Sequence, residues 1–187
     1  MIDYTKAWLG LCAEKAEDAK ICILGIPFDG GASFGKGAAK APQRIRDLAA
    51  EDMPEADDAW ILAKKGILFD FGDVEIDLNW EKSFQRIEDK AYEVMKQGKF
   101  SLFIGGDHSV TIPLHRAFKK YQRERKPDGK IGIIHFDAHF DLCDQFEGHK
   151  WSHANTEKRA LDDIIDPKDL LFLGIRAAES EELEIIE

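Results

Sequence analysis

The stretch IIHFDAHFD at residues 133–141 joins an apolar strand pattern to a run of ionisable side chains. Residues 131–134 are branched and apolar apart from one glycine, which is typical of a strand buried in a parallel sheet. Asp137, His139 and Asp141 then follow at every second position. A fully buried strand rarely ends in three ionisable side chains, so the stretch predicts a polar site at the carboxyl end of a central strand.

Similar apolar runs alternate with helical patterns along the whole chain. Buried strands are expected at residues 21–26, 66–69, 101–104, 131–134 and 170–175. Helices are expected at about residues 3–18, 43–50, 80–97, 110–124 and 178–187. The alternation predicts a three-layer α/β/α domain with a mainly parallel sheet. With 44% hydrophobic content in 187 residues, we expect one domain that spans residues 1–187.

The charge balance argues against several classes of partner. The chain carries 36 acidic and 26 basic residues, and its net charge of −10 makes nucleic acid an unfavourable partner. No stretch resembles a signal peptide or approaches the roughly 20 apolar residues that cross a bilayer, so we expect a soluble, cytoplasmic protein with no membrane partner. Three cysteines without C-x-x-C spacing indicate neither a disulfide framework nor a zinc knot.

A second polar cluster, GGDHS at residues 105–109, follows another expected strand. Ligand sites in open parallel sheets lie beyond the carboxyl ends of the strands, so His108 is expected near Asp137 and its neighbours. If the chain stays extended after residue 136, side-chain alternation places Asp137, His139 and Asp141 on one side. A divalent cation would neutralise the two carboxylates. Mixed oxygen and imidazole ligands suit manganese, or less selectively iron, cobalt or zinc.

Each of these residues also has a structural interpretation. A single D-x-H-x-D pattern is equally consistent with solvated loop residues. Asp107 is interpreted as a helix cap or as the support of a ligand. His135 lies a full step inside its strand and is interpreted as a hydrogen-bonded core histidine, whereas His115 and His149 are assigned structural or solvent-facing roles. The glycine-rich residues 29–38 fit neither the dinucleotide fingerprint nor the phosphate loop, so we expect no nucleotide site.

Taken together, residues 105–109 and 137–141 resemble the first two metal signatures of the ureohydrolase family, which includes arginases and agmatinases. Residues 25–46 and 70–74 resemble the N-terminal region of the same family, especially its agmatinase branch. The likeness covers nearly the whole chain and implies an arginase-like fold.

The resemblance also implies a role for five side chains. His108 and Asp141 would bind one Mn²⁺ ion, His139 would bind a second, and Asp137 would bridge the two. The implied reaction is attack on a guanidinium carbon by water that the ions activate, which gives urea and an amine. His153 follows a serine, as the family's proton-shuttling histidine does, and is the candidate acid for the departing amine.

Two departures from the family pattern change these expectations. Ala154-Asn155 replaces the Gly-Thr or Gly-Ser common in agmatinases, which leaves the substrate open. The family's third signature, an S-x-D-x-D-x-x-D-P type segment with two further aspartates, is not among the 187 residues. We therefore expect four of the six metal ligands and a domain that lacks its C-terminal third, with uncovered apolar surface. We also expect the second ion to bind poorly and the chain as given to be inactive.

Three functional hypotheses stay open. The leading one is a manganese-dependent hydrolase of an agmatine-like guanidino compound, and the second is a formimidoylglutamate hydrolase that releases formamide. The third is a non-catalytic metal-binding fragment or subunit. A mononuclear zinc deacetylase of related fold is less favoured because its ligands would not include both His108 and Asp141. The expected partners are a small guanidino substrate and, by family resemblance, further copies in a homo-oligomer when the protein is full length.

Overall fold

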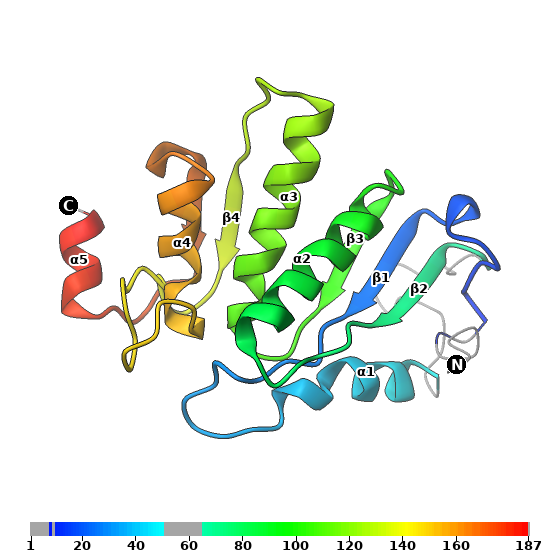
Figure 1. Cartoon of the computed structure of the whole chain (residues 1–187), viewed down its shortest axis with the longest axis horizontal. Coiled ribbons are helices and arrows are strands. Elements are labelled where there is room, and N and C mark those ends of the chain that lie inside the picture. Colours follow the sequence, from blue (N-terminus) through cyan, green and yellow to red (C-terminus); the bar gives the residue numbers. More distant parts are fainter. Residues whose placement is uncertain (1–7, 9, 51–64, 187) are drawn as a thin grey trace.

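Parallel strands form the centre of the fold. The computed structural model describes residue 8, residues 10–50 and residues 65–186. Within these ranges, β1 (Ile21–Gly25), β2 (Leu68–Asp73) and β3 (Phe100–Ile104) form a parallel sheet in the order β2-β1-β3. Strands β4 (Ile133–Phe136) and β5 (Leu170–Leu173) form a parallel pair on the β3 side of that sheet (Figure 1). The predicted parallel pairing is confirmed.

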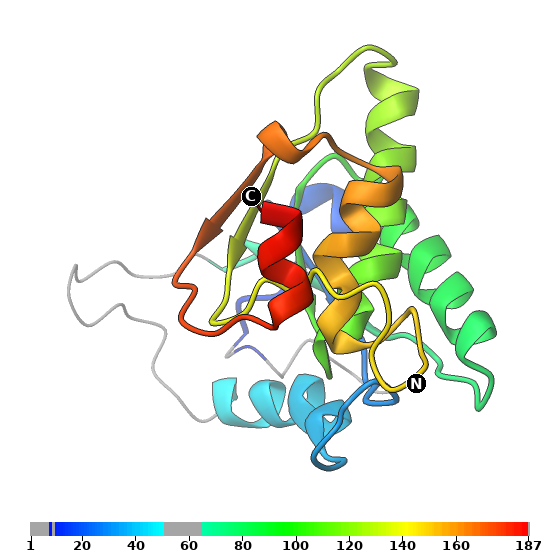
Figure 2. The same cartoon turned by 90° about the vertical axis from the view of Figure 1, so that its left-hand side faces the viewer.

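Three helices cover one face of these strands. Helices α2 (Trp80–Met95), α3 (Thr111–Arg125) and α4 (Thr156–Asp163) lie side by side on this face, as the two views agree (Figures 1 and 2). Helix α1 (Ala41–Ala49) lies below the carboxyl ends of β1 and β2, and α5 (Ser180–Ile186) lies beyond α4 (Figure 1). In the part of the chain described, no helix is long and apolar enough to cross a membrane.

The core lies between the strands and the α2–α3 layer. Strand β1 is buried on both faces, because Cys22, Ile23 and Leu24 are each at most 1% exposed. Apolar side chains of the helices pack against its inner face, including Ile87 of α2 and Ile112 of α3. Burial of this apolar area is the main source of stability for the sheet.

The outer face of β3, β4 and β5 is exposed. Strand side chains alternate, so every second residue points away from the helices. The outward residues are apolar and between 41% and 77% exposed: Phe100, Leu102, Ile134, Phe136, Leu171 and Leu173. The sheet is therefore covered on both faces at β1 but only on its inner face at these three strands, as far as the described residues go.

A buried arginine joins α1 to β2. The side chain of Arg46 is 1% exposed, and its guanidinium donates to Asp70 Oδ2 at 2.7 Å and to Asp73 Oδ1 at 2.6 Å. Burial alone would lower the pKa of Arg46, but the two carboxylates outweigh it and raise that pKa. The arginine is therefore charged, and its two partners fix the helix against the strand.

One expected helix did not form as predicted, and one helix was not expected. The helix expected at residues 3–18 does not form over residues 10–18, where Cys12 pairs with Leu68 in a β-bridge and Ala16–Asp18 is a single 3₁₀ turn. Residues 3–7 and 9 of that expected helix lie outside the described part of the chain. Helix α4 was not predicted.

Candidate metal centre

Polar side chains from the loops after β3 and β4 converge beyond the carboxyl ends of the strands. One ligand atom each of His108, Asp137 and Asp141 lies within 4.8 Å of the other two. His108 Nδ1 is 2.7 Å from Asp141 Oδ2. An imidazole and two carboxylates at this spacing form a donor set that fits a divalent cation.

The loop of residues 137–141 bends sharply, so the expectation of an extended chain was wrong. Asp141 has a φ of 53° and lies in the left-handed region. The bend directs Asp137 and Asp141 toward His108, whereas the side chain of His139 is 60% exposed. His139 Nδ1 is 3.3 Å from Asp137 Oδ1, so this predicted ligand lies at the rim of the group.

Asp137 is held in its ionised form. Partial burial alone would raise the pKa of Asp137, but the backbone N–H of His139 donates to its Oδ1 at 2.9 Å. This hydrogen bond and the nearby rings of His108 and His135 outweigh burial and hold the pKa below its usual value. An ionised carboxylate is the form that binds a cation.

Asp107 and the glycines before it position His108. Asp107 caps the following 3₁₀ turn by accepting from the backbone N–H of Ser109 at 2.8 Å, as predicted for a helix cap. A Cβ on Gly106 would lie 1.9 Å from the carbonyl oxygen of Phe28, so only glycine fits this close approach. The position of His108 thus depends on contact between two loops.

The candidate acid His153 lies on the same pocket as two of the predicted ligands. Its Nδ1 is 2.7 Å from the carbonyl oxygen of Gly31, and the N–H of Gly31 donates to Asp107 Oδ2 at 2.7 Å. A pocket of about 390 Å³ is lined by these described residues: Ser33, Phe34, His139, Asp141, Cys143, Phe146, His153, Ala154, Ala177, Ala178, Glu179 and Glu182. Asp107 therefore supports both His108 and, through Gly31, His153.

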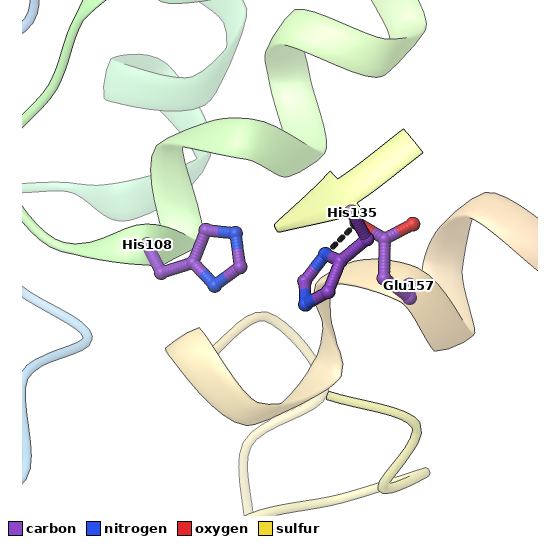
Figure 3. A group of neighbouring side chains, drawn as sticks. All are labelled: His108, His135 and Glu157. Atoms are coloured by element: carbon purple, nitrogen blue, oxygen red, sulfur yellow. Dashed lines mark hydrogen bonds and ion pairs between the residues drawn. The ribbon is translucent and has the colours of Figure 1, made fainter. Parts of the chain in front are cut away.

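Two residues near the centre are buried and make contacts that were not predicted from the sequence. Glu157 is 1% exposed, and its Oε1 is 2.9 Å from Nδ1 of His135, whose ring lies between Glu157 and His108 (Figure 3). The interpretation of His135 as a hydrogen-bonded core histidine agrees with this contact. Asn155 is fully buried, caps the turn before α4, and donates to the carbonyl oxygen of Cys143 at 2.7 Å.

The other two histidines have structural contacts of their own. His149 stacks on Trp80, with ring centroids 5.6 Å apart, in the loop where it was expected. His115 lies in α3, its Nδ1 is buried without a hydrogen-bond partner, and burial holds the pKa of His115 below its usual value. Neither residue belongs to the group formed by His108, Asp137 and Asp141.

Comparison with known proteins identifies the family. Residues 19–187 match the model of the arginase family. An agmatinase from Bacillus anthracis is 35% identical over 173 residues, which cover 90% of this chain and 56% of the relative. A guanidinobutyrase from Pseudomonas aeruginosa is 32% identical over 163 residues, which cover 83% of this chain and 48% of the relative. This chain thus spans about half the length of these curated relatives.

Solved structures show the same fold. A putative agmatinase from Clostridium difficile superposes with a TM-score of 0.81 at 28% identity, covering 91% of this chain and 60% of that one. The predicted arginase-like α/β/α fold class is thereby confirmed. From the two metal signatures at its strand ends, the match over residues 19–187 and the shared fold, we conclude that this chain belongs to the arginase family.

Proposed function

We propose that this chain carries the metal centre of a manganese-dependent hydrolase that cleaves a guanidino cation into urea and an amine. The convergence of His108, Asp137 and Asp141 beside a pocket that also contains His153 carries the proposal. His108, Asp137, His139 and Asp141 would hold the cations. When bound, divalent cations would act as Lewis acids that lower the pKa of water near the substrate carbon.

The hydrogen bonds of His153 suit it to protonate the departing amine. A carbonyl oxygen can only accept, so the contact with Gly31 requires the proton on Nδ1. Nε2 is then the atom that gains and loses a proton, and it lies 3.4 Å from Ser33 Oγ. Delivery of this proton to the leaving nitrogen would release a neutral amine.

The pocket favours a cationic substrate without carboxylates. None of its lining residues within the described chain is Lys or Arg, whereas Asp141, Glu179 and Glu182 contribute carboxylates. Away from the cations that His139 and Asp141 would hold, Glu179 and Glu182 would attract a guanidino cation or its amine, while the acid groups of guanidino acids or formimidoylglutamate would find no Lys or Arg among these residues. The substrate proposed is therefore an agmatine-like guanidino amine.

Manganese content and urea release together test this proposal. The purified chain is dialysed against chelator, titrated with Mn²⁺ by calorimetry, and assayed for urea from agmatine, 4-guanidinobutanoate and formimidoylglutamate. We expect one Mn²⁺ ion to bind more tightly than the second, because the two further aspartates implied by the family pattern are not among the 187 residues. For the same reason we expect little turnover by the chain alone.

The outcomes separate the three hypotheses. Urea from agmatine, by the chain or by a longer form that contains it, supports the proposal. Formamide from formimidoylglutamate, with no urea from any guanidino compound, would replace it with the amidine reaction. Bound metal without any turnover by a longer form would favour a non-catalytic subunit, and no bound divalent cation would refute the metal centre itself.

A further inference from the structure

Glu157 is a charged residue in an unusual place. It lies in the first turn of α4, is 1% exposed, and is not among the residues that line the pocket; Figure 3 shows it beside His135 of β4. Burial of a carboxylate is unfavourable unless hydrogen bonds compensate for lost water. The hydrolytic reaction proposed above assigns it no role, so its contacts require a separate explanation.

Through His135, Glu157 reaches the backbone of the ligand loop. Glu157 Oε1 is 2.9 Å from His135 Nδ1, and the other ring nitrogen, Nε2, is 3.1 Å from the carbonyl oxygen of His139. Because a carbonyl can only accept, His135 Nε2 donates to it. The ring therefore connects the carboxylate of Glu157 to the middle of the loop at residues 137–141.

The backbone of Glu157 holds the same loop at a second point. The N–H groups of Glu157 and Lys158 both donate to the carbonyl oxygen of Asp141, each at 3.1 Å. Asp141 has the left-handed φ of 53°, which a residue with a side chain adopts only when its surroundings hold it there. Its carboxylate is the one that lies 2.7 Å from His108 Nδ1.

We propose that Glu157 is a positioning residue for the candidate metal centre. Its side chain fixes the carbonyl of His139 through His135, and its backbone N–H fixes the carbonyl of Asp141. Together these contacts hold the ligand loop in its bent shape. This inference rests on the proposed metal centre, but the shape of the loop can be measured with or without a metal.

A competing explanation is that Glu157 binds a cation itself, together with His108 and His135. These three residues do offer ligand atoms within 4.8 Å of one another. Glu157 Oε1 and His135 Nδ1 already contact each other, however, and the carboxylate is almost fully buried. Glutamine at this position separates the explanations, because it keeps an acceptor for His135 but is a poor cation ligand.

Affinity for Mn²⁺, measured by calorimetry on the whole chain, tests the proposal. We expect Glu157→Ala to weaken binding by about 10- to 100-fold, as for loss of other groups that orient metal ligands, and Glu157→Gln to restore most of it. Ser83→Ala is the matched control, since Ser83 is fully buried and bonded to the backbone of Asp77 in a different part of the fold. It should lower Tm without changing the affinity.

Unchanged affinity in Glu157→Ala would overturn the proposal, as would a Glu157→Gln variant as weak as Glu157→Ala. If Glu157→Ala does not fold, we use Glu157→Asp instead, because the shorter aspartate side chain places its carboxylate too far from His135 by one methylene. We expect it to show the same weakening, and an unchanged affinity in Glu157→Asp would equally overturn the proposal.

Hydrogen exchange of the metal-free chain distinguishes this inference from the proposed function. The amides of His139 and Leu142, which donate to Asp137 and Glu182, report on the loop. We expect Glu157→Ala, but not Ser83→Ala or Glu157→Gln, to speed their exchange at least about tenfold. A wild-type chain that binds no cation would refute the metal centre, whereas unchanged exchange in Glu157→Ala would refute the positioning role alone.

Discussion

Asp137 and Asp141 contribute to the candidate centre in different ways. Asp137 is kept ionised by an N–H from its own loop, whereas Asp141 is buried against His108 and held by the start of α4. Both carboxylates lie in one small group, so each should affect how strongly the other binds a cation. Replacement of either residue therefore tests the group as a unit.

Asp137→Asn should lower the affinity for Mn²⁺ by at least about tenfold, which corresponds to roughly 1.4 kcal/mol. The amide keeps the shape of the side chain but removes the charge that the cation needs. Calorimetry measures this, with Asp128→Asn in the loop after α3 as the control, because Asp128 belongs to neither cation-binding group. If the wild type, Asp137→Asn and Asp128→Asn bind Mn²⁺ with equal affinity, Asp137 does not bind the cation.

His115 should make stability depend on pH. Burial lowers the pKa of His115 in the folded state, so the folded protein keeps the ring neutral while the unfolded chain takes up a proton below a pH of about 6.5. Its contribution is therefore complete above that pH and is lost as the pH falls below it.

We expect His115→Gln to lose less stability than the wild type between pH 7.5 and 5.5. Urea unfolding at the two pH values measures the difference. His135 has a raised pKa and the opposite dependence, but it is present in both proteins, so the comparison reports the change caused by removing the His115 ring. If the free energy of unfolding changes equally with pH in the two proteins, the pKa of His115 does not differ between the folded and unfolded states.

At the scale of helices and strands, the contact of Arg46 with Asp70 is a buried ionic interaction that joins α1 to β2. Arg46→Ala would leave the carboxylate of Asp70, whose side chain is 1% exposed, without its cationic partner. Loss of one member of a buried pair typically costs about 3–5 kcal/mol in the free energy of unfolding.

Arg86→Ala provides the matched control for this prediction. Arg86 pairs with Asp77 at 3.2 Å, but its side chain is 41% exposed, so its removal should cost at most about 1 kcal/mol. Urea unfolding compares the two variants. Similar losses for both would show that burial of Arg46 is not what makes its contact important.

Strand periodicity predicted the strands well, and the helical patterns predicted four of the helices, namely α1, α2, α3 and α5. Helix α4 was missed because its sequence, TEKRALDD, has only two apolar residues and no clear stripe. The 3₁₀ turn before it, His153–Asn155, is capped locally by Ser152, and buried Asn155 holds this turn against the carbonyl oxygen of Cys143, a contact that sequence periodicity does not reveal. The helix expected at residues 3–18 does not form over residues 10–18, because pairing of Cys12 with Leu68 overrides a helical pattern.

The candidate site was predictable in its residue types but not in its shape. The spacing of His108, Asp137 and Asp141 at two strand ends predicted their convergence, which the structure places within 4.8 Å. Alternation failed for His139, because the left-handed turn at Asp141 breaks the extended chain. No local pattern marks Glu157 as buried, since its burial depends on where α4 packs against β4.

At the scale of the molecule, the exposed outer face of β3, β4 and β5 should promote self-association. Contiguous apolar surface on a sheet favours contact with other molecules. Ile134 and Leu171 are neighbours across β4 and β5, so the double variant Ile134→Thr/Leu171→Thr removes the middle of this face while keeping strand-forming residues.

We expect the double variant to sediment with less oligomer than the wild type at the same concentration. Leu78→Thr is the control, because Leu78 is fully exposed but lies outside the strands. Sedimentation velocity over a range of concentrations measures the effect. If the double variant associates as strongly as the wild type, the outer face is not the contact surface.

The sheet order β2-β1-β3 also constrains how the chain is made. Strand β1 is synthesised first, yet its hydrogen-bonding partners on either side come from residues 68–73 and 100–104. An emerging chain therefore presents Ile21–Gly25, the most buried strand, unpaired while those later residues are still being translated. Contacts this distant in sequence form slowly, so the early ribosome-bound chain is the stage at which a chaperone would be most needed.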